Sequence, residues 1–412
     1  MKTFEQIADL ERHYLLGTYN RYPVALSRGK GVFLYDIDDK RYLDFVSGLG
    51  VNALGHAHPR IVKTIRDQAA KLIHVSNLYY HEYQGALAEK LCTLAAASSG
   101  DGSSEKKFRA FFSNSGTEAI EGSIKLARLA GHRAGGEAKS RLVALEGSYH
   151  GRTFGALSLT GQEKHRKGFE PLLEDVTFVA QNDMEGLRAA VNDNTCAIVL
   201  EPIFGEGGVY ECSVEFLQEC RTLADRHNAA LIFDEIQCGL GRTGTMFAFQ
   251  SFGVSPDIVA IAKPIAAGLP LGAFLAKEEF ANAIAAGQHG TTFGGGPLAC
   301  RVALEFLAIV EDEKLLENVN KVGAYLQQEL RAIAEKSPAA KEVRGRGFIQ
   351  GINLEIPARP IVDAALAEGV LFNSTQDTVV RFLPPFLLEE KHVDKGIRVL
   401  KKLLRNARKK AA

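Results

Sequence analysis

Lys263 is the first residue whose type and position suggest chemistry. It follows the apolar run 258–262 and precedes Pro264 and a glycine-containing loop. Such a run predicts a buried strand, so the amine is expected at a strand end near the interior, where lysine is rarely found without a purpose. An amine held there can act as a nucleophile or a base. From this stretch alone, the simpler explanation is a lysine whose stem packs on the sheet while its charge reaches water.

A carboxylate follows a second apolar run. Asp234 and Glu235 come after residues 230–233, and Gln237 follows closely. This position is the carboxyl edge of a strand, where open α/β sheets bind ligands. A buried carboxylate there can keep a pyridine nitrogen protonated, as a pyridoxal cofactor requires. Taken alone, acidic residues after strands more often cap helices or lie in solvated turns.

Small polar residues lie between the apolar run 108–113 and a helical pattern. Ser115, Gly116 and Thr117 would begin a helix whose free N–H groups and dipole attract phosphate. An ordinary helix cap is the alternative. Because the pattern fits neither the P-loop nor the dinucleotide fingerprint, it argues against a nicotinamide-dependent oxidoreductase.

Two further pairs are candidates for ligand binding. Tyr149 and Arg152 follow the run 141–146 and offer an aromatic face for stacking and a guanidinium for a carboxylate. Glu206 and Arg381 lie far apart in the chain, and nothing in their spacing predicts that they meet. For charged residues of this kind, surface exposure is the default.

Composition excludes several function classes. Lys and Arg total 49 and Asp and Glu total 49, so a net charge of zero gives no general attraction to nucleic acid or anionic membranes. No apolar run approaches the roughly 18 residues of a membrane span, and no secretory signal begins the chain. We expect a cytoplasmic protein. The six cysteines lack CxxC spacing, and His56, His58 and His150 match no helical ligand pair, so we predict no metal site.

The elements that must position these residues follow an α/β pattern. Short β-rich runs at 108–113, 141–146, 196–202, 230–235 and 257–262 alternate with helical patterns. They predict a mainly parallel sheet covered by helices. Between two of these runs, residues 214–227 place an apolar face at helical spacing, formed by Phe216, Leu217, Cys220, Leu223 and Ala224.

The remaining pattern predicts the domain organisation. Residues 130–140, rich in glycine and charge, are the best candidate for a loop, and a long helical pattern runs from Pro297 toward residue 335. We expect an N-terminal segment, 1–55, that contributes to a small domain, a large cofactor-binding domain, 56–300, and a C-terminal part of the small α+β domain, 301–412.

Taken in order, nine segments resemble the class III, fold type I pyridoxal-phosphate-dependent aminotransferases, most closely the acetylornithine and ornithine branch. The resemblance covers nearly the whole chain. The segments are YLDFVSGLGVNALGHAHP, SNLYY, FFSNSGTEAIEGSIKLAR, YHGRTFGALSLTG, EPIFGEGGV, IFDEIQCGLGRTG, AKPIAAGLPLGA, HGTTFGGGPLA and VVRFLPP.

The resemblance implies roles around pyridoxal 5′-phosphate. Lys263 would hold the cofactor covalently and return a proton during catalysis, Asp234 would bind the pyridinium nitrogen, Gln237 would contact the phenolic oxygen, and Tyr149 would stack on the ring.

The resemblance also implies a shared phosphate site. Ser115, Gly116 and Thr117 would hold the phosphate, and Thr292 would reach it from a neighbouring subunit, which implies a homodimer.

Substrate recognition is implied in the same way. Arg152 resembles the arginine that binds the distal carboxylate, and Arg381 the one that binds the α-carboxylate of glutamate. Glu206 stands where the family pairs a glutamate with that second arginine. Leu49, in place of a tyrosine, favours an N-acylated ornithine, whereas Tyr19 is a substrate-binding candidate that keeps ornithine open.

The sequence differs from the usual family pattern at four positions. Tyr149 replaces a phenylalanine, Phe204 a glutamine and Gly296 an asparagine, and Pro264 directly follows the lysine. None of these differences removes a catalytic group.

The resemblance implies an aminotransferase of arginine biosynthesis that moves the δ-amino group of N-acetylornithine to 2-oxoglutarate, giving N-acetylglutamate semialdehyde and glutamate. Ornithine, succinylornithine, 4-aminobutyrate and carrier-linked lysine aminotransferases are alternatives, since they share every catalytic residue named above. A catalytically silent cofactor-binding relative is an alternative from another class.

Overall fold

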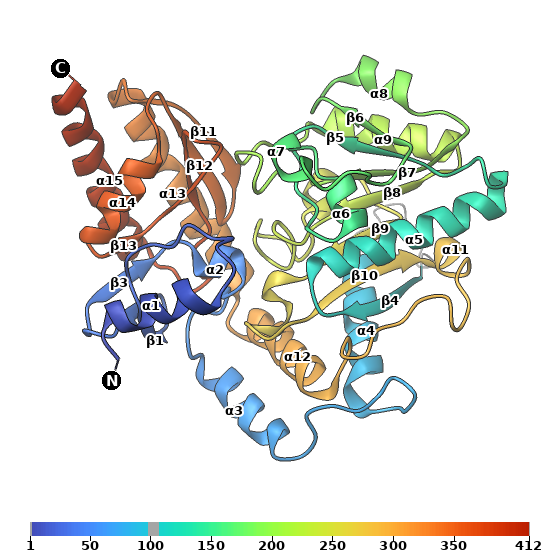
Figure 1. Ribbon diagram of the computed structural model, residues 1–412, viewed down its shortest axis with the longest axis horizontal. Coiled ribbons are helices and arrows are strands. Elements are labelled where there is room, and N and C mark those ends of the chain that lie inside the picture. Colours follow the sequence, from blue (N-terminus) through green and yellow to red (C-terminus); the bar gives the residue numbers. More distant parts are fainter. Residues whose placement is uncertain (1, 98–106, 412) are drawn as a thin grey trace.

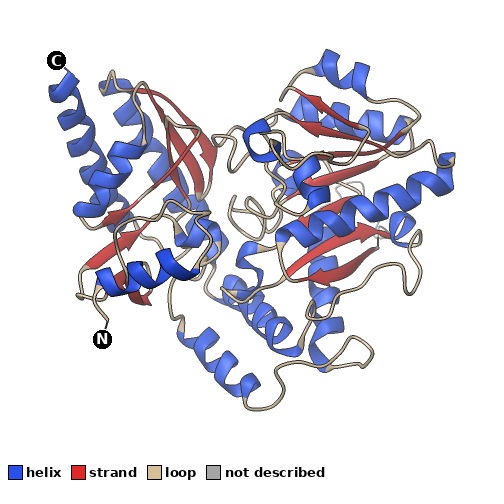
Figure 2. Ribbon diagram, in the orientation of Figure 1, coloured by secondary structure: helices blue, strands red, loops and turns tan. Residues whose placement is uncertain are grey.

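The computed structural model describes residues 2–97 and 107–411. Figure 1 shows a large body on one side, and on the other a smaller body that contains both chain termini. Colouring by secondary structure shows strands covered by helices in both bodies (Figure 2). Among the described residues, no helix combines the length and the apolar character needed to cross a bilayer.

The helices of the described residues are α1 (Phe4–Tyr14), α2 (Ser47–Gly50), α3 (Pro59–Ala69), α4 (Glu82–Ala96), α5 (Gly116–Gly135), α6 (Phe154–Ser158), α7 (Glu163–Arg166), α8 (Met184–Ala190), α9 (Val214–Arg226), α10 (Phe249–Phe252), α11 (Glu278–Ala281), α12 (Pro297–Asp312), α13 (Leu315–Lys336), α14 (Arg359–Ala367), α15 (Glu390–Ala411) and the 3-10 helix η1 (Lys263–Ala266). The strands are β1 (Leu26–Lys30), β2 (Phe33–Asp36), β3 (Arg41–Asp44), β4 (Phe108–Ser113), β5 (Arg141–Leu145), β6 (Val176–Val179), β7 (Thr195–Leu200), β8 (Ala230–Asp234), β9 (Ile258–Ile261), β10 (Gly272–Lys277), β11 (Ala340–Arg346), β12 (Ile349–Leu354), β13 (Val370–Leu371), β14 (Asn373–Thr375) and β15 (Val379–Phe382).

The large body is built on a mainly parallel sheet, as the sequence predicts. Its seven strands, all within the described residues, have the order β4-β10-β9-β8-β7-β5-β6. Adjacent strands from β9 to β6 pair in parallel, and β10 alone runs antiparallel to its two neighbours. The carboxyl ends of the parallel strands therefore meet at one edge, where ligands bind in sheets of this type.

Alternation along the strands buries both faces of this sheet. In β8, Leu231 and Phe233 belong to one hydrophobic cluster, whereas Ala230 and Ile232 belong to a second. The first cluster contains the apolar face of α9, and the second contains that of α5. Because side chains alternate along a strand, two helical layers cover the sheet, one on each face. The predicted apolar face of α9 is confirmed, since all five of its residues are buried.

The smaller body joins the two ends of the chain. One sheet has the order β1-β2-β3-β13, so a C-terminal strand pairs with an N-terminal one, and a second sheet has the order β11-β12-β15-β14. This arrangement agrees with a small α+β domain built from both termini. The boundaries at 55 and 300 stay a prediction; α12, which spans residue 300, packs on α3 and α4, whereas α13 packs on β11 and α15.

The structure corrects three expectations about elements. Strands β6 and β10 were not predicted. The expected loop at 130–140 is wrong in its first half, because α5 continues to Gly135. Gly131 lies inside that helix. Close packing requires a glycine at this position, because a Cβ would come within 2.6 Å of the Lys139 carbonyl oxygen. The long pattern after Pro297 is two helices, separated near Lys314, which has a φ of +50°.

Candidate active site

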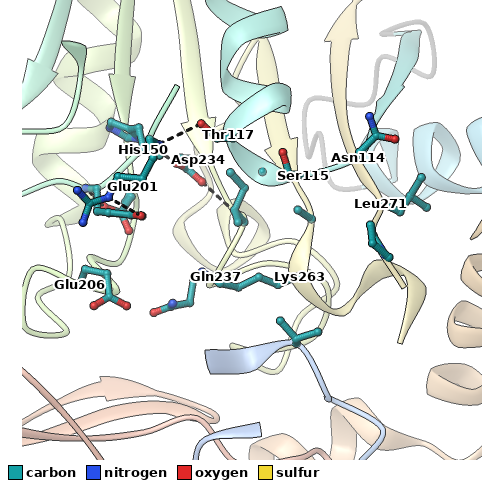
Figure 3. A pocket seen from close by; sticks show the side chains of 18 of the residues that line it. Asn114, Ser115, Thr117, His150, Glu201, Glu206, Asp234, Gln237, Lys263 and Leu271 are labelled. Carbon is teal, nitrogen blue, oxygen red and sulfur yellow. Dashed lines mark hydrogen bonds and ion pairs between the residues drawn. The ribbon is translucent and has the colours of Figure 1, made fainter. Parts of the chain in front are cut away.

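A cavity of about 380 Å³ lies at the carboxyl edge of the central sheet (Figure 3). It brings together side chains from loops after β4, β5, β7, β8 and β9. The residues singled out from the sequence that line it are Ser115, Gly116, Thr117, Tyr149, Arg152, Glu206, Asp234, Gln237 and Lys263. Segments far apart in the chain thus contribute to one site.

Lys263 and Asp234 both face this cavity. Lys263 begins η1 directly after β9 and has a φ of +34°, in the left-handed region that non-glycine residues rarely adopt. Strained backbone of this kind persists where the surrounding fold fixes it, commonly at functional sites. Burial lowers the pKa of the Lys263 amine, although the charge of Glu206 opposes the shift. The amine therefore loses its proton at lower pH than an ordinary lysine.

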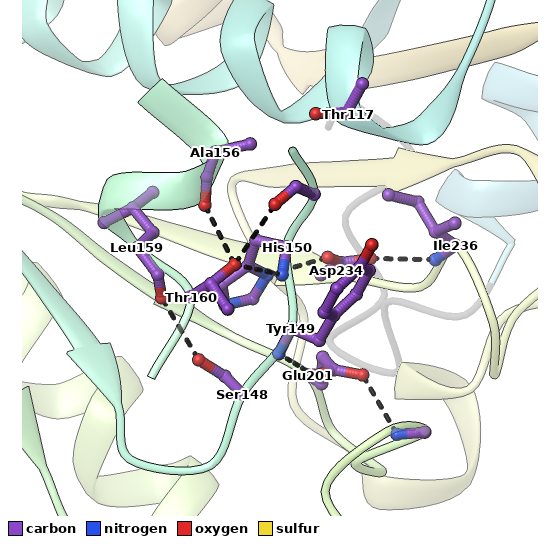
Figure 4. A network of polar contacts seen from close by, with 12 residues as sticks. Thr117, Ser148, Tyr149, His150, Ala156, Leu159, Thr160, Glu201, Asp234 and Ile236 are labelled. Carbon is purple, nitrogen blue, oxygen red and sulfur yellow. Dashed lines mark hydrogen bonds and ion pairs between the residues drawn. The ribbon is translucent and has the colours of Figure 1, made fainter. Parts of the chain in front are cut away.

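Asp234 is held by two donors, one of which the sequence interpretation missed. Its Oδ1 accepts from the Ile236 N–H at 3.0 Å, and its Oδ2 from His150 Nδ1 at 2.7 Å (Figure 4). The His150 side chain is fully buried and that of Asp234 is 4% exposed. Burial alone would lower the pKa of His150, but the hydrogen bond and charge of Asp234 raise it. The contact with His150 therefore fixes the orientation of the Asp234 carboxylate in the cavity.

Glu201 is a second residue that the sequence interpretation missed. It follows β7, lines the cavity and accepts from the N–H groups of Tyr149 at 2.8 Å and Gly205 at 3.0 Å. Burial and the charge of Asp234 raise its pKa to about 7. Its position after a buried parallel strand, at the same sheet edge as Asp234, is a signal that the sequence offered.

The N-terminus of α5 points into the same cavity. Ser115 is its N-cap, and its hydroxyl accepts from the Glu118 N–H at 3.3 Å. Among the described residues, the N–H groups of Gly116 and Thr117 find no hydrogen-bond acceptor. Two free donors at the positive end of a 20-residue helix form an anion site.

Close contacts require glycine at two positions around this anion site. A Cβ on Gly116 would come within 2.7 Å of Ile236 Cδ1. A Cβ on Gly151, which has a φ of +138°, would come within 2.2 Å of Thr117 Oγ1. Glycine at these positions therefore lets the side chains of Ile236 and Thr117 pack closely against the backbone at this site.

Arg381 and Glu206 form an ion pair at the other side of the cavity. Arg381 Nη1 lies 2.7 Å from Glu206 Oε1, and the Arg381 side chain is only 1% exposed. Burial would raise the pKa of Glu206, but the charge and hydrogen bond of Arg381 lower it. The default expectation of surface exposure is thus wrong for Arg381.

Arg152 lies at the outer wall of the cavity. Its Nη2 donates to His165 Nδ1 at 3.1 Å, and its Nε donates to the Tyr149 hydroxyl oxygen at 3.4 Å. Burial, followed by the charge of Arg152, lowers the pKa of His165. A neutral imidazole can accept this hydrogen bond. His165 and the Tyr149 hydroxyl therefore orient the guanidinium of Arg152, which stays exposed.

Three predicted site residues do not line the cavity of their own chain. Arg381 is buried behind Glu206 and Gln237, which do line it. Thr292 is exposed on a surface loop, and Tyr19 is 76% exposed in the N-terminal segment. The histidines considered as metal ligands lie apart: His56 contacts Asp44, and His58 contacts Glu313.

Comparisons with known proteins agree with this geometry. The model of the family "Aminotransferase class-III" matches residues 17–404. The acetylornithine aminotransferase of Methanocaldococcus jannaschii is 44% identical, over 98% of this chain and 99% of its own length.

Two solved structures share the fold over nearly the whole chain. The ornithine aminotransferase of Toxoplasma gondii, which has pyridoxal phosphate at partial occupancy in its active site, has a TM-score of 0.91 at 29% identity and covers 100% of this chain and 96% of its own. The acetylornithine aminotransferase of Elizabethkingia anophelis has a TM-score of 0.85 at 30% identity and covers 98% of this chain and 100% of its own. The chain, with its lysine and aspartate in one cavity, is therefore a member of the class III aminotransferase family.

Proposed function

We propose that this enzyme moves the δ-amino group of N-acetylornithine to 2-oxoglutarate, using pyridoxal 5′-phosphate. The observation that carries the proposal is the cavity shared by Lys263, Asp234 and Glu206, in which Glu206 forms an ion pair with the buried Arg381. The first two residues fit the cofactor, and the ion pair fits a site that must bind two different substrates in turn.

The residues present fit pyridoxal phosphate. Lys263 offers an amine with a lowered pKa for covalent attachment, and Asp234 a carboxylate fixed by two hydrogen bonds for the pyridinium nitrogen. The free N–H groups of Gly116 and Thr117, with the Ser115 hydroxyl beside them, fit the phosphate.

Two more side chains complete the proposed cofactor site. Tyr149 offers its ring for stacking, and Gln237 an amide for the phenolic oxygen.

When bound, the cofactor withdraws the electrons released as the C–H bond beside the reacting nitrogen breaks. The protein must move the proton. Lys263 is the residue proposed for this step, because its Nζ is neutral at a lower pH than that of an ordinary lysine and can take and return a proton. The hydrogen bond from His150 keeps Asp234 in place.

We propose that two arginines each bind a different substrate carboxylate. Arg152, at the outer wall, would bind the carboxylate distant from the reacting amine in N-acetylornithine. Arg381 would bind the α-carboxylate of glutamate, after Glu206 has moved aside. With the Arg381–Glu206 pair closed, the cavity accepts an amine that has no carboxylate beside it; with the pair open, it accepts an amino acid.

Two observations support N-acetylornithine as the amino donor: the name of a similar protein and the residue at position 49. The M. jannaschii relative is an acetylornithine aminotransferase, and Leu49 stands where a tyrosine is typical of ornithine enzymes. The T. gondii structure is an ornithine aminotransferase, which keeps ornithine as the second candidate, with Tyr19 as the proposed contact. With N-acetylornithine as donor, the reaction belongs to arginine biosynthesis. A cytoplasmic location stays a prediction.

A homodimer is proposed from an exposed apolar patch around Thr292. Ile73, Leu78, Tyr80 and Phe293 are each more than half exposed, and Asn77 ties their two segments together by donating to the carbonyl oxygens of Thr291 and Gly294. Patches of this kind mark protein interfaces. A second copy covering it would bury Thr292 and offer its hydroxyl to the partner's phosphate site. Light scattering of the holoenzyme tests the dimer, and a monomer at micromolar concentration would contradict it.

Half-reactions with single donors test the reaction itself. Purified holoenzyme is mixed in turn with N-acetylornithine, succinylornithine, ornithine and 4-aminobutyrate, and the loss of cofactor absorbance is followed. The highest kcat/KM is expected for N-acetylornithine, with 2-oxoglutarate restoring the spectrum. A higher value for any other donor would reject the proposed substrate, and no reaction with any donor would support a catalytically silent relative.

A further inference from the structure

The strand register places Asn373 beside the buried guanidinium of Arg381. Asn373 on β14 and Arg381 on β15 are direct partners in an antiparallel pair. Side chains of such partners lie on the same face of a sheet and within reach of each other. Because Arg381 has five N–H donors and is almost completely buried, each contact it makes affects how it can bind a ligand.

Arg381 makes two different sets of contacts. On one edge, Nε and Nη2 both donate to Asn373 Oδ1, at 3.0 and 2.6 Å. On the other side, Nη1 donates to the Gly205 carbonyl oxygen at 2.7 Å, to Glu206 Oε1 at 2.7 Å and to Gln237 Oε1 at 3.2 Å. Glu206 alone among these acceptors is charged.

The end of β14 and the residue that follows it fix the backbone of Glu206. The Thr375 hydroxyl donates to the Glu206 carbonyl oxygen at 2.7 Å, and Gln376 Nε2 donates to the same oxygen at 2.9 Å. The carboxylate of Glu206 can therefore leave Arg381 only by rotation of its side chain. Glu206 and Lys263 line the same cavity, and Figure 3 shows Gln237 between them, so a carboxylate that replaced Glu206 would lie in the cavity of the reacting amine.

An arginine that exchanges Glu206 for a substrate carboxylate needs a second, permanent acceptor. Gly205 and Gln237 accept only from Nη1, so without an acceptor for Nε and Nη2 the guanidinium could turn when Glu206 moved, and those two groups would be buried without hydrogen bonds. A carboxylate in that place would neutralise the arginine permanently and compete with the substrate. The neutral oxygen of an amide holds the side chain without cancelling its charge.

We propose that Asn373 is a positioning residue that holds Arg381 in place, and positively charged toward the cavity, whether or not Glu206 is paired with it. The proposal rests on the proposed function in one respect, the use of Arg381 for the α-carboxylate of glutamate. On this proposal, Asn373 affects the binding of glutamate and 2-oxoglutarate but not the binding of N-acetylornithine.

The test compares Asn373→Asp and Asn373→Ala holoenzymes with the wild type. Asn373→Asp keeps the shape and adds a charge, and Asn373→Ala removes the acceptor. Glutarate, a dicarboxylate that cannot react, is titrated by calorimetry, and the KM and kcat of the half-reactions with glutamate and N-acetylornithine are measured. Asn353→Asp is the matched control, because Asn353 pairs with the other side of β15 and contacts Thr378 rather than Arg381.

Asn373→Asp is expected to weaken glutarate binding and raise the glutamate KM by about 10-fold or more. Asn373→Ala is expected to do so by about 3- to 10-fold. In both variants the N-acetylornithine KM stays within about 3-fold of the wild type, and Asn353→Asp leaves all values unchanged. Unchanged glutarate binding in both variants would overturn the proposal, as would an equal loss in the two half-reactions.

Failure of the proposed function would give a different result. A wild-type enzyme that binds glutarate but does not react with N-acetylornithine would reject the proposed donor. The effect of Asn373 on glutarate binding would still be measured in that case.

Discussion

Replacement of His150 tests how the protein holds the carboxylate of Asp234. In His150→Leu, Asp234 Oδ2 loses its donor at 2.7 Å, while Oδ1 keeps the Ile236 N–H. A buried hydrogen bond to a charged group contributes about 1.5–3 kcal/mol. If that energy supports the charge needed in the transition state, the rate of each half-reaction falls about 10- to 150-fold.

The assay is stopped-flow absorbance of the holoenzyme with glutamate, together with the thermal midpoint. His150→Asn, whose amide can still donate, is expected to recover most of the rate. His58→Leu is the matched control, since it removes another largely buried histidine that contacts a carboxylate, 3.3 Å from Glu313 and outside the cavity. A His150→Leu rate within 3-fold of the wild type, or an equal loss in His58→Leu, would refute this explanation.

Three further results are expected. Because burial lowers the pKa of Lys263, the folded apoprotein holds fewer protons than the unfolded chain between that pKa and about 10.4. Lys263→Met should therefore raise the apoprotein melting temperature at pH 7 by about 1–3 °C, an advantage that shrinks as the pH approaches 10; a lower midpoint would contradict the shift. His165→Leu, which removes the acceptor for Arg152, should raise the N-acetylornithine KM about 3- to 10-fold in steady-state assays and leave the glutamate KM unchanged; equal changes would argue against a role for Arg152 in donor binding. Gly151→Ala should weaken cofactor binding at least about 10-fold in equilibrium dialysis, whereas Gly168→Ala, also at positive φ but with open space, should not; equal loss would mean that strain alone is responsible.

The sequence predicted the elements whose pattern is strong. Five apolar runs of the central sheet and the apolar face of α9 are confirmed, because burial on both faces of a sheet leaves continuous apolar stretches. Strand β6 is mostly only partly buried, so it lacks a strong apolar run. Strand β10 follows β9 without an intervening α-helix and pairs with it antiparallel, so it does not fit the alternation of strands and helices. Gly131 contributed to the prediction of a loop, because glycine is frequent in loops. The structure shows that glycine is needed there for close packing of the helix.

Site geometry was predictable in part. The residues after strand ends had to meet, because parallel strands end at one edge, and Lys263, Asp234 and Ser115 do meet there. The contact between Arg381 and Glu206 depends on the packing of the small body against the large one, which no local pattern encodes; only the family resemblance indicated it.

The role of His150 was missed for a similar reason. The sequence interpretation weighed it as a metal ligand or a turn residue, whereas its contact with Asp234 joins loops after two different strands, β5 and β8. Spacing along the chain does not record such a contact.

The most direct test of the account is chemical identification of the lysine that carries the cofactor. Holoenzyme is reduced with sodium borohydride, digested and mapped by mass spectrometry. The account predicts the phosphopyridoxyl group on Lys263, and its loss in Lys263→Ala. The group on another lysine, such as Lys277 at the opposite end of the β9–β10 pair, or no modified lysine at all, would contradict it.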